Sequence, residues 1–166
     1  MQVPSKPNVS GLLGPLAVDK QLSSRGLEAW DSFLRAHATL LRRLEVDLVQ
    51  ETGLALADFD VLAQLARAGG ELRMTDLANR ALISRSGMTR RVARLVSEGL
   101  VRKADANEDG RGVVVSLTDA GVERLSETAP VHLRAVSELF VSQLDGQEPT
   151  VLKNALDRVS VDCTFG

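Results

Sequence analysis

The chain has 166 residues, 44% of them hydrophobic, which is enough for one globular domain with an extension for self-association. Its formal net charge of −2 excludes a protein that is basic over its whole surface. The single cysteine, Cys163, excludes an intramolecular disulfide and favours a reducing, cytoplasmic setting. No apolar run approaches the ~20 residues that a membrane-spanning helix needs, so we expect no membrane partner.

Residues 1–25 hold three of the five prolines and predict an N-terminal arm. Residues 26–53 follow as a helical region, with a long helix expected over Leu27–Gln50. Apolar side chains recur there at alternating spacings of three and four, which is typical of a helix that packs along a seam against other helices. The seam consists of Leu27, Trp30, Leu34, His37, Leu41, Leu44 and Leu48.

Residues 54–118 predict a compact unit of three helices and a small antiparallel β wing. The pattern is a helix, a tight break, a second and basic helix, and two β-rich segments joined by a polar tip. This order is that of a winged helix-turn-helix, which binds DNA. The expected elements are Leu56–Ala68, a strand at Glu71–Met74, a helix capped by Thr75, the basic helix Ser84–Glu98, and strands Leu100–Ala104 and Val113–Leu117.

The helix expected over Ser84–Glu98 is strongly basic on one side. Met88, Val92 and Leu95 form its core-facing stripe, and short hydroxyls and arginines occupy the other face and its flanks. Hydroxyl and guanidinium groups are the ones that contact base edges and phosphates in DNA. The candidate DNA-binding residues of this helix are Ser84, Arg85, Ser86, Thr89, Arg90, Arg91 and Arg94.

Charge is distributed unevenly along the chain. Residues 85–111 contain seven basic and four acidic side chains, a net charge of +3, so the remainder must carry −5. A local basic patch on an acidic body directs polyanions to one face. At the tip of the wing, Asp109 and Arg111 lie two residues apart, and pairing would hold Arg111 ready for a narrow minor groove. The alternative is a solvated loop in which such a pair contributes little.

Residues 119–166 complete the helical region. Thr118 is expected to cap a helix that runs to about Leu144, with a kink or break at Pro130, and a last helix is expected over Thr150–Val161. Together with residues 26–53 these helices predict a dimerisation region. The expected fold class is therefore mainly α, with a winged helix-turn-helix core between long N- and C-terminal dimerisation helices.

The segments SRSGMTRRVARLVSEGLV, EDGRG and VVVSLTDAG resemble the MarR family of winged-helix transcriptional regulators. The resemblance implies a homodimer in which a helix like Ser84–Glu98 enters the major groove and an arginine like Arg111 enters the minor groove. Arg91 and Ala93 depart from the family pattern, because the first position is commonly apolar and the second commonly acidic.

Many members of that family bind small, often aromatic anions in a crevice between the N-terminal helices and the DNA-binding core. The resemblance implies that Trp30, Phe33, His37 and Phe59 would line such a crevice; the alternative is that all four pack in the core. No cofactor is implied beyond such an effector. A metal site has little support, since the only histidines and the cysteine are far apart in the sequence.

These observations predict a homodimeric, sequence-specific regulator that binds a pseudo-palindromic site in double-stranded DNA. The resemblance implies that the regulator is a ligand-responsive repressor. The alternative is a winged-helix module for protein–protein contact, which the row of Ser86, Arg90 and Arg94 argues against because partner surfaces usually add aromatic anchors. An enzyme is not expected, since no glycine-rich phosphate loop and no nucleophile–base pair is found.

Overall fold

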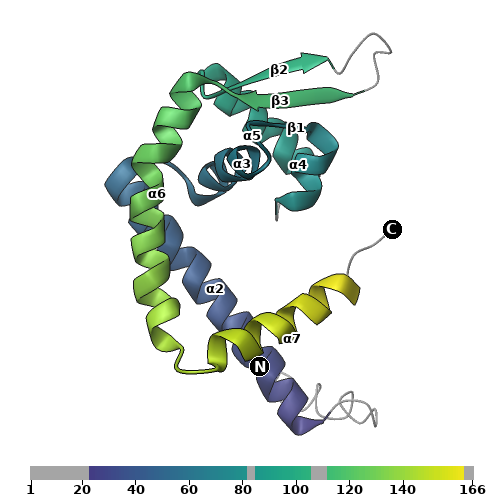
Figure 1. Cartoon of the computed structure of the whole chain (residues 1–166), viewed down its shortest axis with the longest axis vertical. Coiled ribbons are helices and arrows are strands. Elements are labelled where there is room, and N and C mark those ends of the chain that lie inside the picture. The colour runs from purple at the N-terminus through teal and green to yellow at the C-terminus, as the bar shows by residue number, and fades with distance from the viewer. Residues whose placement is uncertain (1–22, 82–84, 106–111, 163–166) are drawn as a thin grey trace, which may run out of the picture. The chain divides into compact units, whose positions relative to one another are not determined.

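The computed structural model describes residues 23–81, 85–105 and 112–162 (Figure 1). Of the predicted features, most of the arm, the Ser84 cap and the wing-tip residues Asp109 and Arg111 lie outside the described residues, as does the side chain of Arg85. Contacts divide the chain into two units, Met1–Thr39 and Leu40–Gly166. None of the described helices is long and apolar enough to cross a membrane.

The described part of the first unit is the N-terminal portion of helix α2 (Ser24–Thr52). The helix begins where the Ser23 hydroxyl accepts a hydrogen bond from the Gly26 amide at 3.0 Å, a typical N-terminal cap. It ends in the second unit at Thr52, and the next residue, Gly53, has a φ of 71°, a left-handed conformation that favours glycine. The helix expected over Leu27–Gln50 is confirmed and is a few residues longer at each end.

The second unit contains the predicted winged helix-turn-helix and the helices that follow it (Figure 1). The mainly α fold class is confirmed, and most elements begin or end within a few residues of the positions expected from the sequence. They are α3 (Leu56–Arg67), β1 (Glu71–Arg73), α4 (Met74–Arg80), α5 (Arg85–Ser97), β2 (Val101–Asp105), β3 (Val113–Leu117), α6 (Asp119–Leu139), the 3₁₀ turn η1 (Val141–Gln143) and α7 (Glu148–Asp162).

The three strands form an antiparallel sheet in the order β1-β3-β2. Val115 of β3 lies between Leu72 of β1 and Lys103 of β2. The Leu117 amide adds a hydrogen bond of 2.8 Å to the Gly70 carbonyl just before β1. The base of the wing is therefore paired with the strand that leads into α4.

The core of the second unit is built around α3. Val61, Leu62 and Leu65 are fully buried, and α3 contacts α4, α5, α6, β1 and β3. From α5 the core receives the predicted stripe of three apolar side chains, all fully buried. Because this stripe is fixed in the core, the opposite side of α5 faces outward. The buried residues contributed by the other elements of the winged helix-turn-helix are Leu77 and Ala81 near α4, Met88, Val92 and Leu95 of α5, and Val101 and Val115 of the sheet.

The predicted cap at Thr75 is wrong. Helix α4 begins one residue earlier, at Met74, and its N-cap is Arg73, which makes no side-chain capping hydrogen bond. Arg73 is also the last residue of β1 and retains an extended backbone, so the chain passes directly from strand to helix. Thr75 therefore lies inside the first turn of α4.

The predicted start of α6 is confirmed, the helix is unbroken at Pro130, and its end differs from expectation. The Thr118 hydroxyl accepts a hydrogen bond from the Gly121 amide at 3.0 Å. Pro130 does not break the helix, because it removes one backbone donor from a helix of 21 residues that packs on α3. The helix ends at Leu139 rather than near Leu144, and η1 occupies the intervening segment.

Candidate nucleic-acid interface

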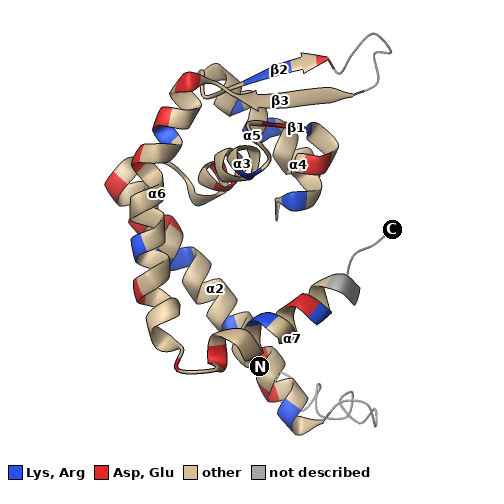
Figure 2. Cartoon of the chain, in the orientation of Figure 1, with Lys and Arg blue, Asp and Glu red and all other residues tan. Residues whose placement is uncertain are grey.

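Helix α5 presents a polar face to solvent. Ser86, Thr89 and Arg90 are exposed, while the apolar stripe on the opposite side of the helix is buried. On the neighbouring strand β2, Arg102 and Lys103 are also exposed, and the Arg102 Nε donates to the Ser116 hydroxyl at 3.1 Å. Figure 2 shows basic residues on α4, α5 and β2, whereas acidic residues recur along the first half of α6. Among the described residues, exposed basic side chains therefore lie on α5 and on strand β2 of the wing.

A hollow of about 310 Å³ lies on this face of α5. Gly87 and three arginines, Arg90, Arg91 and Arg94, line it. Guanidinium groups offer several N–H donors in a fixed planar arrangement that matches phosphate and carboxylate oxygens. The hollow is therefore chemically suited to an anionic group such as a DNA phosphate.

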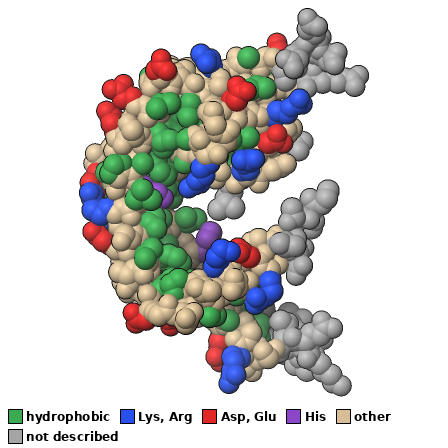
Figure 3. Space-filling view, in the orientation of Figure 1, with side chains coloured by type: hydrophobic (Ala, Val, Ile, Leu, Met, Phe, Trp, Pro, Cys, Tyr) green, Lys and Arg blue, Asp and Glu red, His purple; other side chains and the backbone are tan. Residues whose placement is uncertain are grey.

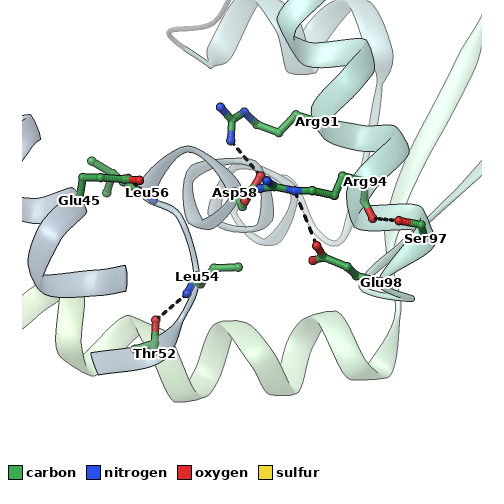
Figure 4. Close-up of polar contacts among 9 residues, drawn as sticks. All are labelled: Glu45, Thr52, Leu54, Leu56, Asp58, Arg91, Arg94, Ser97 and Glu98. Atoms are coloured by element: carbon green, nitrogen blue, oxygen red, sulfur yellow. Dashed lines mark hydrogen bonds and ion pairs between the residues drawn. The ribbon is translucent and has the colours of Figure 1, made fainter. Parts of the chain in front are cut away.

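A buried carboxylate from another helix meets two of these arginines (Figure 4). The side chain of Asp58, in the first turn of α3, is only 2% exposed. Its Oδ1 accepts a hydrogen bond from Arg91 at 3.0 Å, and its Oδ2 forms an ion pair with Arg94. Arg94 also lies 3.6 Å from the Glu98 carboxylate, measured from Nε to Oε1. Two of the arginines expected at the DNA surface therefore have carboxylate partners within the protein.

The position of Asp58 on α3 explains why its carboxylate is buried. Asp58, Leu62 and Leu65 are spaced by four and three residues, so the acid lies on the apolar stripe of the helix. Its place in the first turn is favourable for an anion, because the N-terminal end of a helix carries partial positive charge. The burial of an unpaired carboxylate is strongly unfavourable, and the two guanidinium groups supply the necessary counter-charge.

Sequence reasoning missed Asp58, although two signals pointed to it. An acid on the buried stripe of α3 requires a partner, and Arg91 occupies a position that is commonly apolar in proteins that resemble this one. The two residues are 33 positions apart in the sequence, so helical periodicity alone does not connect them. Of the predicted DNA-binding residues, the structure brings Ser86, Thr89 and Arg90 together on one face and places Arg91 and Arg94 beside Asp58.

The predicted effector residues fall into two groups. Trp30, Phe33 and His37 are exposed on α2 in the first unit, and successive ring centroids along this row are 6.0 Å apart. Phe59 is 7% exposed in the core of the second unit, where its ring lies 4.4 Å from that of His132 on α6. Phe59 therefore packs in the core, as the alternative interpretation expected, whereas the three residues on α2 do not.

His132 is a further buried polar group that the sequence did not reveal. Among the described side chains, its Nδ1 is the one buried nitrogen or oxygen atom without a hydrogen-bond partner. Burial, with a smaller contribution from the nearby charge of Arg67, lowers the pKa of His132, and Asp60 opposes this shift. The imidazole is thus held in its neutral form more strongly than a solvated histidine.

Comparison with known proteins connects this geometry with a family. The model of the MarR family matches residues 52–112. An uncharacterized HTH-type transcriptional regulator of Bacillus cereus is 30% identical over 118 residues, which are 70% of this chain and 77% of that protein. Among solved structures, this chain is similar to AbsC, a MarR family transcriptional regulator from Streptomyces coelicolor, with a TM-score of 0.77 and 30% sequence identity. The match covers 85% of this chain and 95% of the AbsC chain. Sco3205, a MarR family regulator from the same organism solved in complex with DNA, has a TM-score of 0.81 at 32% identity, covering 87% of this chain and 91% of its own.

Proposed function

Because this chain belongs to the MarR family and is a DNA-binding transcriptional regulator rather than an enzyme, we propose that it is a homodimeric repressor that binds a pseudo-palindromic operator. The observation that carries the proposal is the polar face of α5. Its exposed row of Ser86, Thr89 and Arg90 is held outward by the buried stripe on the other side of the helix.

In the proposed complex α5 lies in the major groove of double-stranded DNA. Ser86 and Thr89 supply hydroxyl groups for base edges or phosphates, and Arg90 supplies a guanidinium group for guanine or phosphate. The DNA complex of Sco3205, which is similar to this chain over most of its length, supports this use of the fold. From the sequence, Arg85 and the wing-tip pair Asp109 and Arg111 belong to the same proposal, with Arg111 in the minor groove.

Large apolar side chains left exposed outside the DNA-binding region support the proposed homodimer. They lie on α2, α6, η1 and α7, and Figure 3 shows hydrophobic side chains gathered at the surface over α6. Exposed apolar side chains that gather on one surface mark protein–protein contact. A two-fold dimer would place two recognition helices about 34–36 Å apart, one turn of DNA. In the second unit these side chains are Leu41, Val46, Val49, Val122, Leu133, Phe140, Val141, Val151 and Val159.

Selection of fragments from genomic DNA by the purified protein tests the proposal most directly. We expect the bound fragments to share a two-fold repeat, and a reporter gene placed behind that sequence to be silenced by the protein. Arg90→Ala should weaken operator binding by about tenfold or more, because one good contact of this type is worth ~1–3 kcal/mol. Arg158→Ala, which removes an exposed arginine from α7, is the matched control and should bind like the parent.

Three outcomes would count against the proposal. Bound fragments without a shared repeat, together with equal affinities for the parent and Arg90→Ala, would show that α5 does not recognise DNA in this way. Capture of a protein partner that survives nuclease treatment, without measurable DNA binding, would favour the alternative of a protein–protein interaction module. Sedimentation of the parent as a monomer at micromolar concentration would contradict the homodimer separately.

The exposed row of Trp30, Phe33 and His37 on α2 favours a small aromatic anion as an effector. Flat rings stack on such a row, and His37 offers a hydrogen-bond donor to an acidic substituent. Trp30 is the only tryptophan of the chain, so its fluorescence reports on this surface. Titration with benzoate should quench that fluorescence in a saturable manner and weaken operator binding, and Phe33→Ala should abolish both effects. Fluorescence and DNA affinity that do not change with benzoate would count against a small aromatic anion as the effector.

A further inference from the structure

We propose that Asp58 is a positioning residue for DNA binding, which holds Arg91 and Arg94 within the protein and so limits the number of phosphates that α5 neutralises. This inference rests on the proposed function, because it assumes that α5 is the DNA-binding helix. Asp58 thus controls non-specific affinity for DNA, although it is buried in α3 and contributes almost no exposed area to the DNA-binding surface.

The geometry makes Asp58 a shared counter-ion for the two arginines. Each of its carboxylate oxygens is engaged by a different guanidinium group, Oδ1 by Arg91 and Oδ2 by Arg94. The side chain of Arg91 is 29% exposed and that of Arg94 is 50% exposed, whereas that of Asp58 is 2% exposed. Both arginines therefore reach inward from the surface of α5 to a group that water hardly reaches (Figure 4).

The guanidinium groups of Arg91 and Arg94 do not readily exchange the Asp58 carboxylate for a DNA phosphate as their ion-pair partner. A phosphate on the duplex surface is already solvated and accompanied by counter-ions, whereas Asp58 would lose its partner inside the protein. Loss of one partner from a buried ion pair is much more unfavourable than loss of one partner from an exposed ion pair. Arg91 and Arg94 thus remain with Asp58 when α5 approaches DNA, and only their outward N–H groups are left for the ligand.

The charge of this cluster is balanced. Arg91 and Arg94 contribute two positive charges, and Asp58 and Glu98 contribute two negative charges at the distances described above. Of the arginines that line the hollow on α5, Arg90 is the one outside this cluster of ion pairs. The helix that is the most basic segment in the sequence is consequently less cationic in the folded protein than its sequence indicates.

Such a balance lowers the affinity that does not depend on DNA sequence. Non-specific affinity for DNA arises almost entirely from the number of phosphates neutralised, because each one releases condensed counter-ions. Base contacts add affinity at the operator alone. By withdrawing two cations from the phosphate interaction, Asp58 removes part of the affinity that does not depend on sequence, so base contacts supply a larger share of the binding free energy at the operator.

The test is the salt dependence of binding to a duplex of unrelated sequence, measured for the full-length parent and for Asp58→Asn. Asparagine retains the shape and an acceptor oxygen but removes the charge that holds the arginines. We expect Asp58→Asn to bind this duplex more tightly. We also expect the slope of log affinity against log salt to steepen by about 1–2, since each additional phosphate contributes about 0.9.

Asp60→Asn is the matched control. Asp60 lies two residues further along α3, is half-buried, and accepts a hydrogen bond from Gln64 at 3.2 Å. Its substitution changes the net charge of the protein by the same amount as Asp58→Asn. We expect its salt slope to equal that of the parent. Equal steepening in both variants would mean that overall charge, and not release of the two arginines, causes the effect, and it would overturn the inference.

Arg94→Gln and Arg90→Gln test the same idea with Asp58 in place, should Asp58→Asn fail to fold. We expect Arg90→Gln to lower the slope by about 1 and Arg94→Gln to leave it unchanged. A slope that falls equally in both variants would overturn the inference, as would an Asp58→Asn protein that is less stable but has the parent slope. If Arg90→Gln itself leaves the slope unchanged, the proposed function fails, and this outcome is distinct from a failure of the Asp58 inference alone.

Discussion

The Glu45 carboxylate of α2 accepts a hydrogen bond of 2.7 Å from the Leu56 amide, the first residue of α3 (Figure 4). Ala55, the N-cap of α3, has no side-chain oxygen and makes no capping hydrogen bond. A residue 11 positions upstream thus satisfies a backbone donor at the start of the helix, where an anion is also favoured by the helix dipole. The helix that carries Asp58 is held at its first residue by the end of α2.

Glu45→Ala should therefore destabilise the protein by about 1 kcal/mol, the usual effect of removing a helix cap. Glu45→Gln retains an acceptor oxygen and should recover part of this loss. The measurement is urea unfolding followed by circular dichroism. Glu123→Ala, on the exposed side of α6, should remain within about 0.5 kcal/mol of the parent. An equal effect of Glu45→Ala and Glu123→Ala would show that the contact does not cap α3.

Removal of both partners of Asp58 should be far more destabilising than removal of either. Arg91→Ala and Arg94→Ala each leave one guanidinium group on the buried carboxylate, whereas the double variant leaves none and should lose about 3–5 kcal/mol. The two single losses should sum to clearly less than the double loss in a double-mutant cycle measured by denaturant unfolding. Arg90→Ala, which lies outside the cluster, is the control and should lower the free energy of unfolding by about 0.5 kcal/mol or less. Additive single effects would contradict a shared counter-ion.

Gly121→Ala should destabilise the junction between the wing and α6. A Cβ atom at this buried position would overlap the Leu100 carbonyl oxygen and lie 3.2 Å from a methyl group of Leu117. Because the carbonyl belongs to the backbone, relief requires movement of the chain, and we expect a loss of about 1–3 kcal/mol. Thermal unfolding provides the measurement, with the exposed neighbour Ala120→Ser as control. Equal melting temperatures for the two variants would mean that the helix shifts freely at this point.

His132 should make the protein less stable in mild acid. Burial lowers the pKa of His132 in the folded state below the ordinary value of 6.5. At pH values between the folded-state pKa and 6.5, the unfolded chain therefore binds more protons than the folded protein. This contribution to stability is complete above pH 6.5 and is lost as the pH falls through that window. His132→Asn should remove this part of the pH dependence between pH 7.5 and 5, measured as the free energy of unfolding. His37→Asn, which replaces an exposed ring on α2, should retain it, and identical profiles for the parent and His132→Asn would refute the assignment.

Periodicity predicted the parts of the fold that depend on local pattern. Met88, Val92 and Leu95 recur at helical spacing, so the buried face of α5 followed directly from the sequence, and the cap at Thr118 followed from residue type and position. The Thr75 cap failed because the backbone of β1 leads straight into α4, and no side-chain cap was needed.

The candidate site was predictable only in part, since its electrostatics depend on a tertiary contact. Arg94 projects from the outward side of α5, as the helical pattern predicts, yet its long side chain returns to Asp58. Periodicity assigns directions to Cβ atoms and not to the ends of flexible side chains. Only the packing of α3 against α5 brings the Asp58 carboxylate to this guanidinium group. The roles of Ser86, Thr89 and Arg90 at DNA stay predictions.

The contact of Asp58 with two arginines also limits the order in which mutations can accumulate at this surface. Replacement of both arginines while Asp58 is present leaves a buried charge without a partner, so that route passes through a poorly folded intermediate. Replacement of Asp58 first leaves the two arginines partly exposed and able to point into solvent. Variants with new residues at both position 91 and position 94 are therefore expected to arise in lineages where position 58 has already changed.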